Sequence, residues 1–160
     1  MIRAAKFVDI PRMVELLCLA HAASKYAGRV PVSQSAAHTL LQQAVTRHGG
    51  QHAGGALVMV AEVDGEVQGL MVGALTRVYE IGEKLQANDL FLFVTPAAGK
   101  TDASRLLDAY IEWADANPKV DREDVKLSYT DALPGGERVE AMYAKKGFRR
   151  CGAIFERAGE

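Results

Sequence analysis

The chain has 160 residues, of which 49% are apolar and 24% are charged, and both fractions are ordinary for a globular protein. Its 19 basic and 20 acidic side chains give a net charge of −1, which excludes a general electrostatic attraction to nucleic acid or to an anionic membrane. At this length we expect a single domain over residues 1–160, and no apolar stretch is long enough to cross a bilayer.

The cysteines and histidines indicate neither a disulfide framework nor a metal site. Cys18 falls in a helical apolar stripe and Cys151 in a predicted late strand, so we expect two reduced thiols in a cytoplasmic protein. The first residues, MIRAAKFVDIP, lack the apolar core of a signal peptide. The histidines lack metal-ligand spacing and are expected on the surface; they are His21, His38, His48 and His52.

The first half of the chain predicts one short strand, two helices and a hairpin. Residues 1–7 favour a strand, and a helix follows with Asp9 as its N-cap and Gly28 as its end. A second helix is expected over residues 32–50, capped by Ser33 or Ser35. Residues 56–80 form two β-branched and apolar runs on either side of Asp64-Gly65, which is a strong hairpin signal.

The second half predicts alternating strands and helices. A connector over 81–88 leads to a strand at about 89–95, which Pro96 ends. An amphipathic helix is expected over 103–118, a strand at about 125–130, a helix over 134–147, and a last strand or hairpin arm over 148–160. This order predicts an α/β domain with a mixed sheet and helices on both faces.

The segment between the strand at 89–95 and the next helix reads TPAAGKTDASR. It contains a Gly-Lys-Thr triplet of the kind that ends a nucleotide-binding loop. A P-loop needs its first glycine at the position of Val94, and valine does not adopt the dihedral angles of that turn. A strand, a tight loop and a helix N-terminus still direct several backbone N–H groups to one point, where a phosphate group binds well. The alternative is an ordinary loop with small residues.

Four segments together resemble the GNAT superfamily of N-acetyltransferases. LFLFVTPAAGKTDASRLLDAYIEWA is similar to its central strand, loop and helix, with Val94, Pro96, Leu106 and Leu107 at matching places. IRAAKFVDIPRMVELL, VAEVDGEVQGLMVGAL and MYAKKGFRRCGAIFER resemble its first strand and helix, its second and third strands, and its closing Tyr-x-x-x-Gly-Phe segment. The loop spacing resembles the phage- and prophage-associated branch most.

The resemblance implies a mostly antiparallel sheet whose fourth and fifth strands splay apart to hold acyl-CoA. Backbone groups near Phe93 and Val94 would pair with the pantetheine arm. The loop would bind the pyrophosphate; its residues are Gly99, Lys100, Thr101, Asp102, Ala103, Ser104 and Arg105. The resemblance also implies a homodimer.

Acetyl transfer to an amine needs a base or a water path for the amine proton, a donor for the oxyanion and an acid for the leaving thiolate. Tyr143 matches the family's tyrosine and is the candidate acid, because a phenol is protonated at neutral pH. Asp89 is the candidate base, directly or through water, although it could equally be a solvated strand-end carboxylate. Glu62 and Glu80 lie on predicted strands that could line the acceptor side.

Three functions are compatible with these observations. The first is transfer of acetyl from acetyl-CoA to a primary amine, of a small molecule or a protein, by direct attack. The second is a GNAT-fold binding module that holds CoA weakly, because Gly99, Thr101 and Gly136 replace residues that commonly contact the cofactor. The third, a small nucleotide-binding protein, is disfavoured by Val94. The first two helices and the segment 78–88 would shape the acceptor site.

Overall fold

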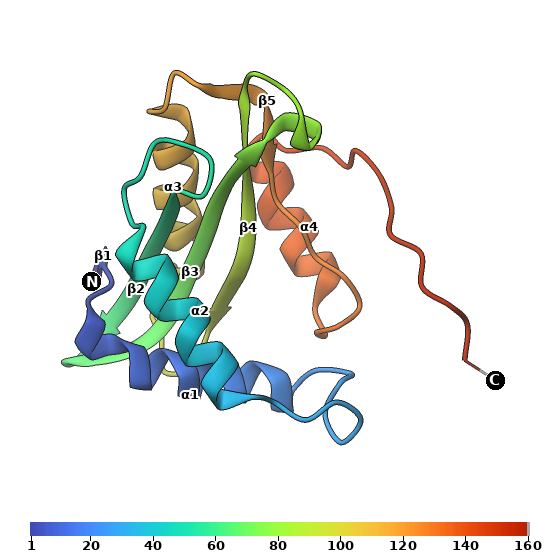
Figure 1. Cartoon of the computed structure of the whole chain (residues 1–160). Coiled ribbons are helices and arrows are strands. Elements are labelled where there is room, and N and C mark those ends of the chain that lie inside the picture. Colours follow the sequence, from blue (N-terminus) through green and yellow to red (C-terminus); the bar gives the residue numbers. More distant parts are fainter. Residues whose placement is uncertain (160) are drawn as a thin grey trace.

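The computed structural model describes residues 1–159 and contains one five-stranded sheet with helices on both faces (Figure 1). The strands are β1 (Ile2–Ala4), β2 (Ala56–Val63), β3 (Glu66–Arg77), β4 (Leu85–Val94) and β5 (Val120–Lys126), and they are neighbours in that order. Every neighbouring pair is antiparallel except β4 and β5, which run parallel. The prediction of a mixed, mostly antiparallel α/β sheet is therefore confirmed.

The hairpin between β2 and β3 forms where the sequence predicts it. Asp64 and Gly65 have φ angles of 51° and 83°, and Val63 pairs with Glu66 across the turn. Two successive residues with positive φ match the right-handed twist of the flanking strands. Glycine takes this conformation without strain, and aspartate is among the residues that tolerate it best.

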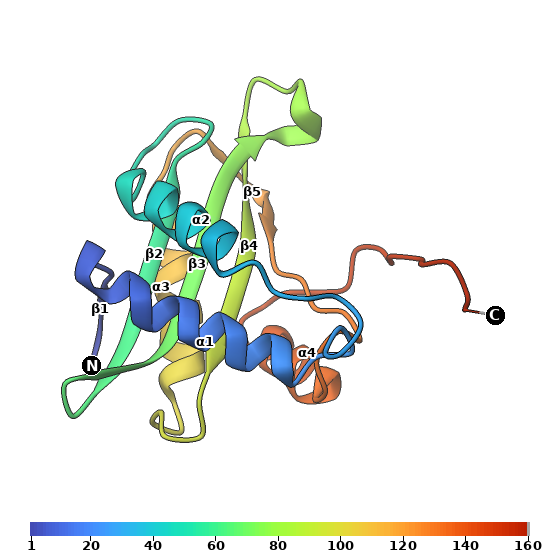
Figure 2. The same ribbon diagram turned by 60° about the horizontal axis from the view of Figure 1, so that its bottom comes forward.

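Helices α1 (Ile10–Ala22) and α2 (Gln34–Thr46) cover one face of the sheet (Figure 2). Ser33 caps α2 as predicted, because its Oγ accepts a hydrogen bond from the Ala36 N–H at 3.2 Å. Apolar side chains from both helices pack on β2 and β3 and are removed from water, which stabilises the fold. The largest fully buried side chains of this layer are Met13, Leu16 and Leu41 from the helices and Val58, Val60, Leu70 and Val72 from the strands.

Helices α3 (Asp102–Asp115) and α4 (Gly136–Lys145) cover the other face. The predicted apolar stripe of α3 is confirmed, since Leu106, Leu107 and Tyr110 are fully buried against the sheet. Gly73 of β3 makes room for this helix, because a Cβ there would lie 2.8 Å from the Tyr110 ring. One face of β4 therefore packs toward α1 and α2 through Phe91 and Phe93, and the other packs toward α3 and α4 through Leu92 and Val94.

Asp9 stands at the predicted N-cap position of α1, but its side chain has a different role. Its side chain makes no capping bond to α1; instead it accepts hydrogen bonds from the Arg3 guanidinium at 2.8 and 3.0 Å and from the Lys6 N–H at 2.7 Å. Arg3 also donates to Glu62 of β2 at 2.6 Å. These bonds hold the pKa of Asp9 below its usual range, chiefly through Arg3. Glu62 therefore belongs to an ion cluster with Arg3 and Asp9 beside β1.

Two predicted strand boundaries were wrong. β4 begins at Leu85 and not at about 89, because Leu85 and Ala87 are buried while Gln86 and Asn88 alternate with them, a half-buried pattern that resembled a connector. β5 spans Val120–Lys126 and not about 125–130. Its run of charged residues at 121–124 lies on the last strand of the sheet, where charged side chains remain in water.

The predicted last strand over 148–160 is also wrong for the residues that the structure describes. From Phe148 to Gly159 the chain has no regular secondary structure, and its ribbon lies outside the layers of the sheet and helices (Figure 1). It returns to the body of the molecule through Glu156, which pairs with Lys25 in the loop after α1 at 2.7 Å. Cys151 is exposed and lies in no strand, and Ile154 and Phe155 are 80% and 92% exposed. The pattern of apolar residues suits a strand, but no described strand lies beside it. Residue 160 lies outside the described residues.

Over the same described range, none of the helices combines the length and the apolar character needed to cross a bilayer.

Candidate functional site

The parallel strands β4 and β5 pair over only the first part of their length. Leu85 pairs with Val120, Ala87 with Val125 and Asn88 with Lys126, and the pairing ends there. β4 continues to Val94 beside β3, so residues 89–94 have a paired edge toward β3 and an open edge on the other side. The two strands therefore splay after Asn88. We call the open edge of β4 over residues 89–94 the split.

A β-bulge marks the start of the split. Asp89 pairs with Gly73 and Phe91 pairs with Val72, so Leu90 is an extra residue without a partner on β3. A bulge bends its strand and redirects side chains, and such features occur often beside functional sites. Leu90 consequently stays 49% exposed although it lies in the middle of the sheet.

The backbone N–H and C=O groups of successive β4 residues point alternately toward β3 and toward the split. The Thr95 N–H donates to the Gln68 carbonyl at 2.8 Å, which fixes residue 95 toward β3. Because alternate residues of an antiparallel pair point the same way, the backbone of Phe93 also faces β3, and those of Leu92 and Val94 face the split. The Phe93 carbonyl lies beside Gly69 of β3, which agrees with this assignment. Of the two residues expected to pair with a pantetheine arm, Val94 thus presents its N–H and C=O to the split, while the Phe93 backbone faces β3.

Asp89 and Tyr143, the predicted base and acid, meet at Ser128. The Asp89 carboxylate accepts from the Ser128 N–H at 3.0 and 3.1 Å and from its hydroxyl at 2.9 Å. The Tyr143 hydroxyl donates to the Ser128 carbonyl at 3.0 Å. Ser128 follows β5, so these bonds connect β4, the end of β5 and α4 at the point where the strands separate. We call this group the Ser128 junction.

Burial sets the protonation behaviour of the Ser128 junction. Desolvation raises the pKa of Asp89 above its usual value, although the hydrogen bonds from Ser128 oppose this shift. Burial also raises the pKa of Tyr143, and the negative charge of Asp89 adds to the effect. The phenol is therefore held as a proton donor, and the carboxylate is a stronger base than an exposed aspartate.

The loop after β4 is closed by one of its own residues. The buried Asp102 carboxylate accepts from the Gly99 N–H at 2.8 Å, and Arg105 lies 3.6 Å from its other oxygen. Asp102 thus occupies one of the donors expected for a pyrophosphate. Val94 lies within β4, so the glycine turn of a P-loop is absent at this position.

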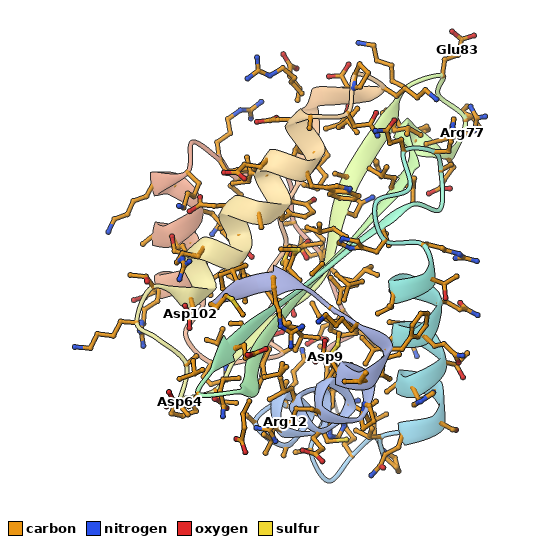
Figure 3. The ribbon with its side chains drawn as sticks, turned by 90° about the vertical axis from the view of Figure 1, so that its left-hand side faces the viewer. Asp9, Arg12, Asp64, Arg77, Glu83 and Asp102 are labelled. Carbon is orange, nitrogen blue, oxygen red and sulfur yellow. The ribbon has the colours of Figure 1, made fainter. Side chains whose placement is uncertain are left out.

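Other donors of the loop remain open. Within residues 1–159, no protein acceptor receives a hydrogen bond from the backbone N–H groups of four loop residues: Lys100, Thr101, Ala103 and Ser104. They lie at the start of α3, where the helix dipole favours an anion, and the side chains of Lys100 and Arg105 are exposed beside them. The loop lies close to the hairpin turn at Asp64, at the opposite end of the molecule from Arg77 and Glu83 (Figure 3).

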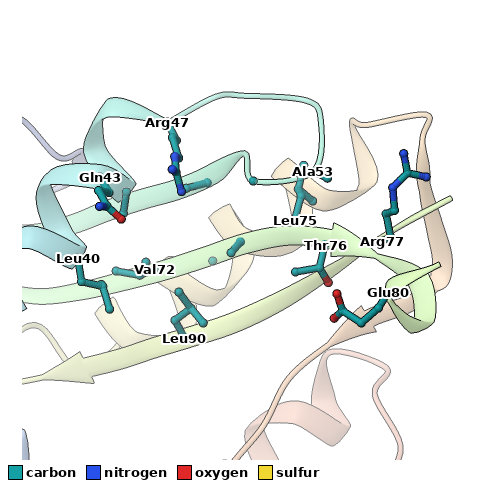
Figure 4. A pocket seen from close by; sticks show the side chains of 15 residues that line it. Leu40, Gln43, Arg47, Ala53, Val72, Leu75, Thr76, Arg77, Glu80 and Leu90 are labelled. Carbon is teal, nitrogen blue, oxygen red and sulfur yellow. The ribbon is translucent and has the colours of Figure 1, made fainter. Parts of the chain in front are cut away.

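A cavity of about 380 Å³ opens on the α1 and α2 side of the sheet, beside the bulge (Figure 4). α2 contributes one helical face, and β3 and Leu90 contribute the floor. Glu80 lines this cavity, but it lies in a 3₁₀ turn over Val78–Glu80 rather than on a strand as expected. Val72 and Leu90 lie at one end of the cavity with Arg47 above them on the α2 side, whereas Arg77 and Glu80 lie at the other end (Figure 4).

Some expected residues have structural roles instead. His48 is half-buried rather than fully on the surface, and its Nδ1 accepts from the Val58 N–H at 3.0 Å; burial lowers its pKa. Gly136 lies under the Tyr129 ring, where a Cβ would come within 2.9 Å of the ring, so packing explains the glycine. The part of the chain that the structure describes holds no cluster of His, Cys, Asp or Glu suited to a metal ion.

No family model matches the chain, and no curated protein matches it. Solved structures match it over nearly its whole length. A ribosomal-protein-alanine N-acetyltransferase from Brucella melitensis is 18% identical, with 100% of this chain and 98% of that chain covered and a TM-score of 0.72. An acetyltransferase from Trypanosoma brucei is 16% identical, with 99% and 98% covered and a TM-score of 0.68.

A predicted acetyltransferase from Clostridium acetobutylicum, whose structure was determined with acetyl-CoA, is 14% identical, with 99% and 95% covered and a TM-score of 0.66. The chain therefore has the fold of the GNAT acetyltransferases. The more specific likeness to the phage-associated branch stays a prediction.

Sequence reasoning missed Ser128, the bulge at Leu90 and Arg47, which lines the cavity. Ser128 lies in a segment that resembles a strand, and its partners are 39 and 15 residues away. Only the splay of β4 and β5 brings these groups together. The sequence offered one signal for the bulge: two adjacent polar residues, Asn88 and Asp89, break the alternation of apolar and polar residues along β4.

Proposed function

We propose that this protein transfers an acetyl group from acetyl-CoA to a primary amine by direct attack of the amine on the thioester. The observation that carries the proposal is the split, because it combines free backbone groups of β4 with the Ser128 junction. An extended pantetheine arm can pair with Leu92 and Val94 as an added strand would. The open N–H groups at the start of α3 would then receive the pyrophosphate.

The residues of the Ser128 junction suit the proton transfers of this reaction. Asp89 Oδ2 accepts only one of the three hydrogen bonds from Ser128, so it retains capacity to take the amine proton, directly or through water. N–H groups of β4 that face the split can stabilise the oxyanion. The Tyr143 O–H can leave the Ser128 carbonyl and protonate the departing thiolate of CoA. The amine enters from the cavity beside Leu90.

Release of free CoA thiol from acetyl-CoA in the presence of primary amines tests the proposal. We expect amine-dependent release in the native chain and a large loss of the maximal rate in Tyr143→Phe, with binding of acetyl-CoA retained. Tyr26→Phe is the matched control, since Tyr26 lies in the loop after α1 and contributes to none of these contacts. Amine-independent release, or none with any amine, would contradict the enzymatic function.

A second candidate function rests on one specific observation. The Asp102 carboxylate accepts the hydrogen bond of the Gly99 N–H and adds a negative charge at the loop. The chain can therefore instead hold CoA weakly and act as a binding module. Binding of acetyl-CoA without turnover of any amine would favour this function over the enzymatic one.

A further inference from the structure

Tyr110 of α3 is a buried titratable residue that takes no part in the proposed proton transfers. Its side chain is fully buried, and its hydroxyl donates to the carbonyl of Lys126, the last residue of β5, at 2.7 Å. Its ring lies against Gly73 of β3, where a Cβ would come within 2.8 Å of it. Gly73 pairs with Asp89. Tyr110 therefore contacts the strands on both sides of β4 beside the proposed base.

The hydrogen bonds change character directly after Lys126, which pairs with Asn88 as the last pair of the parallel ladder. In a parallel pair, a residue bonds to the residues before and after the one opposite it. In a continued register Asp89 would lie opposite Leu127, and the Ser128 N–H would donate to the Asp89 carbonyl. The Ser128 N–H donates to the Asp89 carboxylate instead, at 3.0 and 3.1 Å. The side chain of Asp89 thus replaces its own backbone where the strands separate.

This replacement depends on the position of the end of β5. Only Leu127 separates Lys126 from Ser128, so the orientation of the Lys126 carbonyl limits where the Ser128 N–H and hydroxyl lie. Tyr110 fixes that carbonyl from the α3 side of the sheet. Its ring packs on Gly73 and lies 5.9 Å from the Trp113 ring, between centroids, so the hydroxyl has little freedom to move.

The Tyr110 hydroxyl acts only as a hydrogen-bond donor. Of the described residues, only Lys126 accepts a hydrogen bond from it. Burial raises the pKa of Tyr110, and the nearby Asp89 and Tyr143 add to the effect. Tyr110 from α3 and Tyr143 from α4 are the titratable groups whose pKa values respond to Asp89, and both stay protonated. Over the acid range, Asp89 is therefore the group of this cluster that titrates.

We propose that Tyr110 is a positioning residue for acetyl transfer: by holding the end of β5, it keeps Ser128 where it orients the Asp89 carboxylate. This inference rests on the proposed function, because it concerns the step in which Asp89 takes the amine proton. Ser128 supplies all three of the hydrogen bonds that reach Asp89 from β5 and its end. A shift of the end of β5 weakens them together, while the open backbone groups of β4 keep their bonds to β3.

Tyr110→Phe tests the role by removing the hydroxyl and keeping the ring, so the core stays filled. We expect kcat to fall about fivefold, the loss that one net hydrogen bond predicts, and KM for acetyl-CoA to change less than twofold. Tyr79→Phe is the matched control, because Tyr79 is 86% exposed in the turn after β3. An unchanged kcat, or a change in KM alone, would overturn the inference.

The pH profile separates positioning from a contribution to stability alone. The hydrogen bonds from Ser128 oppose the burial that raises the pKa of Asp89, so loosening them should move the acid limb of kcat/KM to higher pH in Tyr110→Phe. Ser128→Ala removes the hydroxyl donor at 2.9 Å and should move the limb in the same direction. A merely structural Tyr110 would lower the free energy of unfolding and leave the limb in place.

The double variant tests whether Tyr110 acts through Ser128. Because both side chains act on the same carboxylate, Tyr110→Phe combined with Ser128→Ala should lose less kcat than the product of the two single losses. Losses that multiply would show that Tyr110 acts independently of Ser128, and would overturn the proposed connection.

Titration of the Asp89 carboxyl by carbon-13 NMR, in the chain without acetyl-CoA, does not depend on turnover. The signal is assigned by its loss in Asp89→Asn. The pKa of Asp89 should be higher in Tyr110→Phe than in the native chain and in Tyr79→Phe, and this shift would support the positioning role even if no amine is acetylated. If amines are acetylated but neither this titration nor kcat differs between Tyr110→Phe and the native chain, the positioning role is wrong and the proposed function stands.

Discussion

The two halves of the β4–β5 pair differ in what their backbones do. Over Leu85–Asn88 the strands share a parallel ladder, and the buried side chains of Leu85 and Ala87 belong to the core beneath α3. Beyond Asn88 the same strand keeps its bonds to β3 but loses its neighbour on the other side. A sheet can thus be stable along one edge of a strand while its other edge stays available for a ligand.

The Ser128 junction and the bulge keep the open half open. Asp89 binds the backbone of Ser128, and so takes up hydrogen-bonding capacity that would otherwise continue the ladder. Tyr110 of α3 also takes up hydrogen-bonding capacity at the end of β5, because its hydroxyl donates to the Lys126 carbonyl at 2.7 Å. The following variants break or refine this contrast between the paired and the open half.

The largest effect is expected at Tyr143. Tyr143→Phe removes the proposed acid from the open half, so the maximal rate of CoA release should fall about 100-fold, within the range for loss of general acid catalysis. Binding of acetyl-CoA should change less than twofold, because the ring still packs under the sheet. A maximal rate within twofold of the native value would exclude Tyr143 as the acid.

The next effect is expected at Gly73 of β3, which pairs with Asp89 where the paired half of β4 meets the open half. Gly73→Ala would place a Cβ 2.8 Å from the Tyr110 ring, so we expect the free energy of unfolding to fall by about 2 kcal/mol through overpacking. Gly152→Ala is the matched control, because no atom lies within 4 Å of that position. Denaturant unfolding of both variants measures the difference, and equal stabilities would show that α3 can move away from β3 without cost.

Asp89→Asn should lower kcat/KM about tenfold, the size expected for loss of a hydrogen-bonded base with partial rescue by water. The pH dependence gives a sharper test. Asp89 must be ionised to accept a proton, and burial raises its pKa, so activity should fall as the pH decreases through a pKa above the ordinary aspartate value. The variant should lose this acid limb. An unchanged limb would mean that another group titrates.

The smallest effect is expected at the loop. Asp102→Asn removes a negative charge beside the site proposed for the pyrophosphate, and a repulsion of about 1 kcal/mol corresponds to a Kd for acetyl-CoA roughly fivefold lower. The effect should shrink in high salt, because screening weakens the repulsion. Calorimetry at low and high salt measures it. Weaker binding in Asp102→Asn would show that this carboxylate orders the loop for the ligand.

Sequence reasoning predicted the paired elements better than the open ones. The Asp64-Gly65 hairpin, the stripe of α3 and the Ser33 cap depend on neighbours within a few residues, and each was confirmed. Local patterns also explain the errors. The start of β4 was predicted too late because Gln86 and Asn88 are polar. The start of β5 was predicted too late because its charged run resembled a loop, since its outer edge faces water.

The site depends on contacts between distant residues. Asp89 and Tyr143 could be proposed only through the family resemblance, and no pattern in the sequence places both of them on Ser128. Asp102 illustrates the same limit, since its carboxylate is consistent with a helix-start residue but also closes the loop on Gly99. The roles assigned to the site residues, from Gly99 to Arg105 and at Val94, stay predictions that ligand binding can test.

Calorimetric titration with acetyl-CoA tests the central claim most directly, with Lys100→Glu beside the native chain and Arg122→Glu as the matched charge reversal on β5. We predict micromolar binding that weakens at least about tenfold in Lys100→Glu, because the reversed charge lies at the open N–H groups of the loop, and stays unchanged in Arg122→Glu. No heat at millimolar acetyl-CoA, or equal affinity in all three proteins, would contradict the claim that the split and its loop hold the acetyl donor.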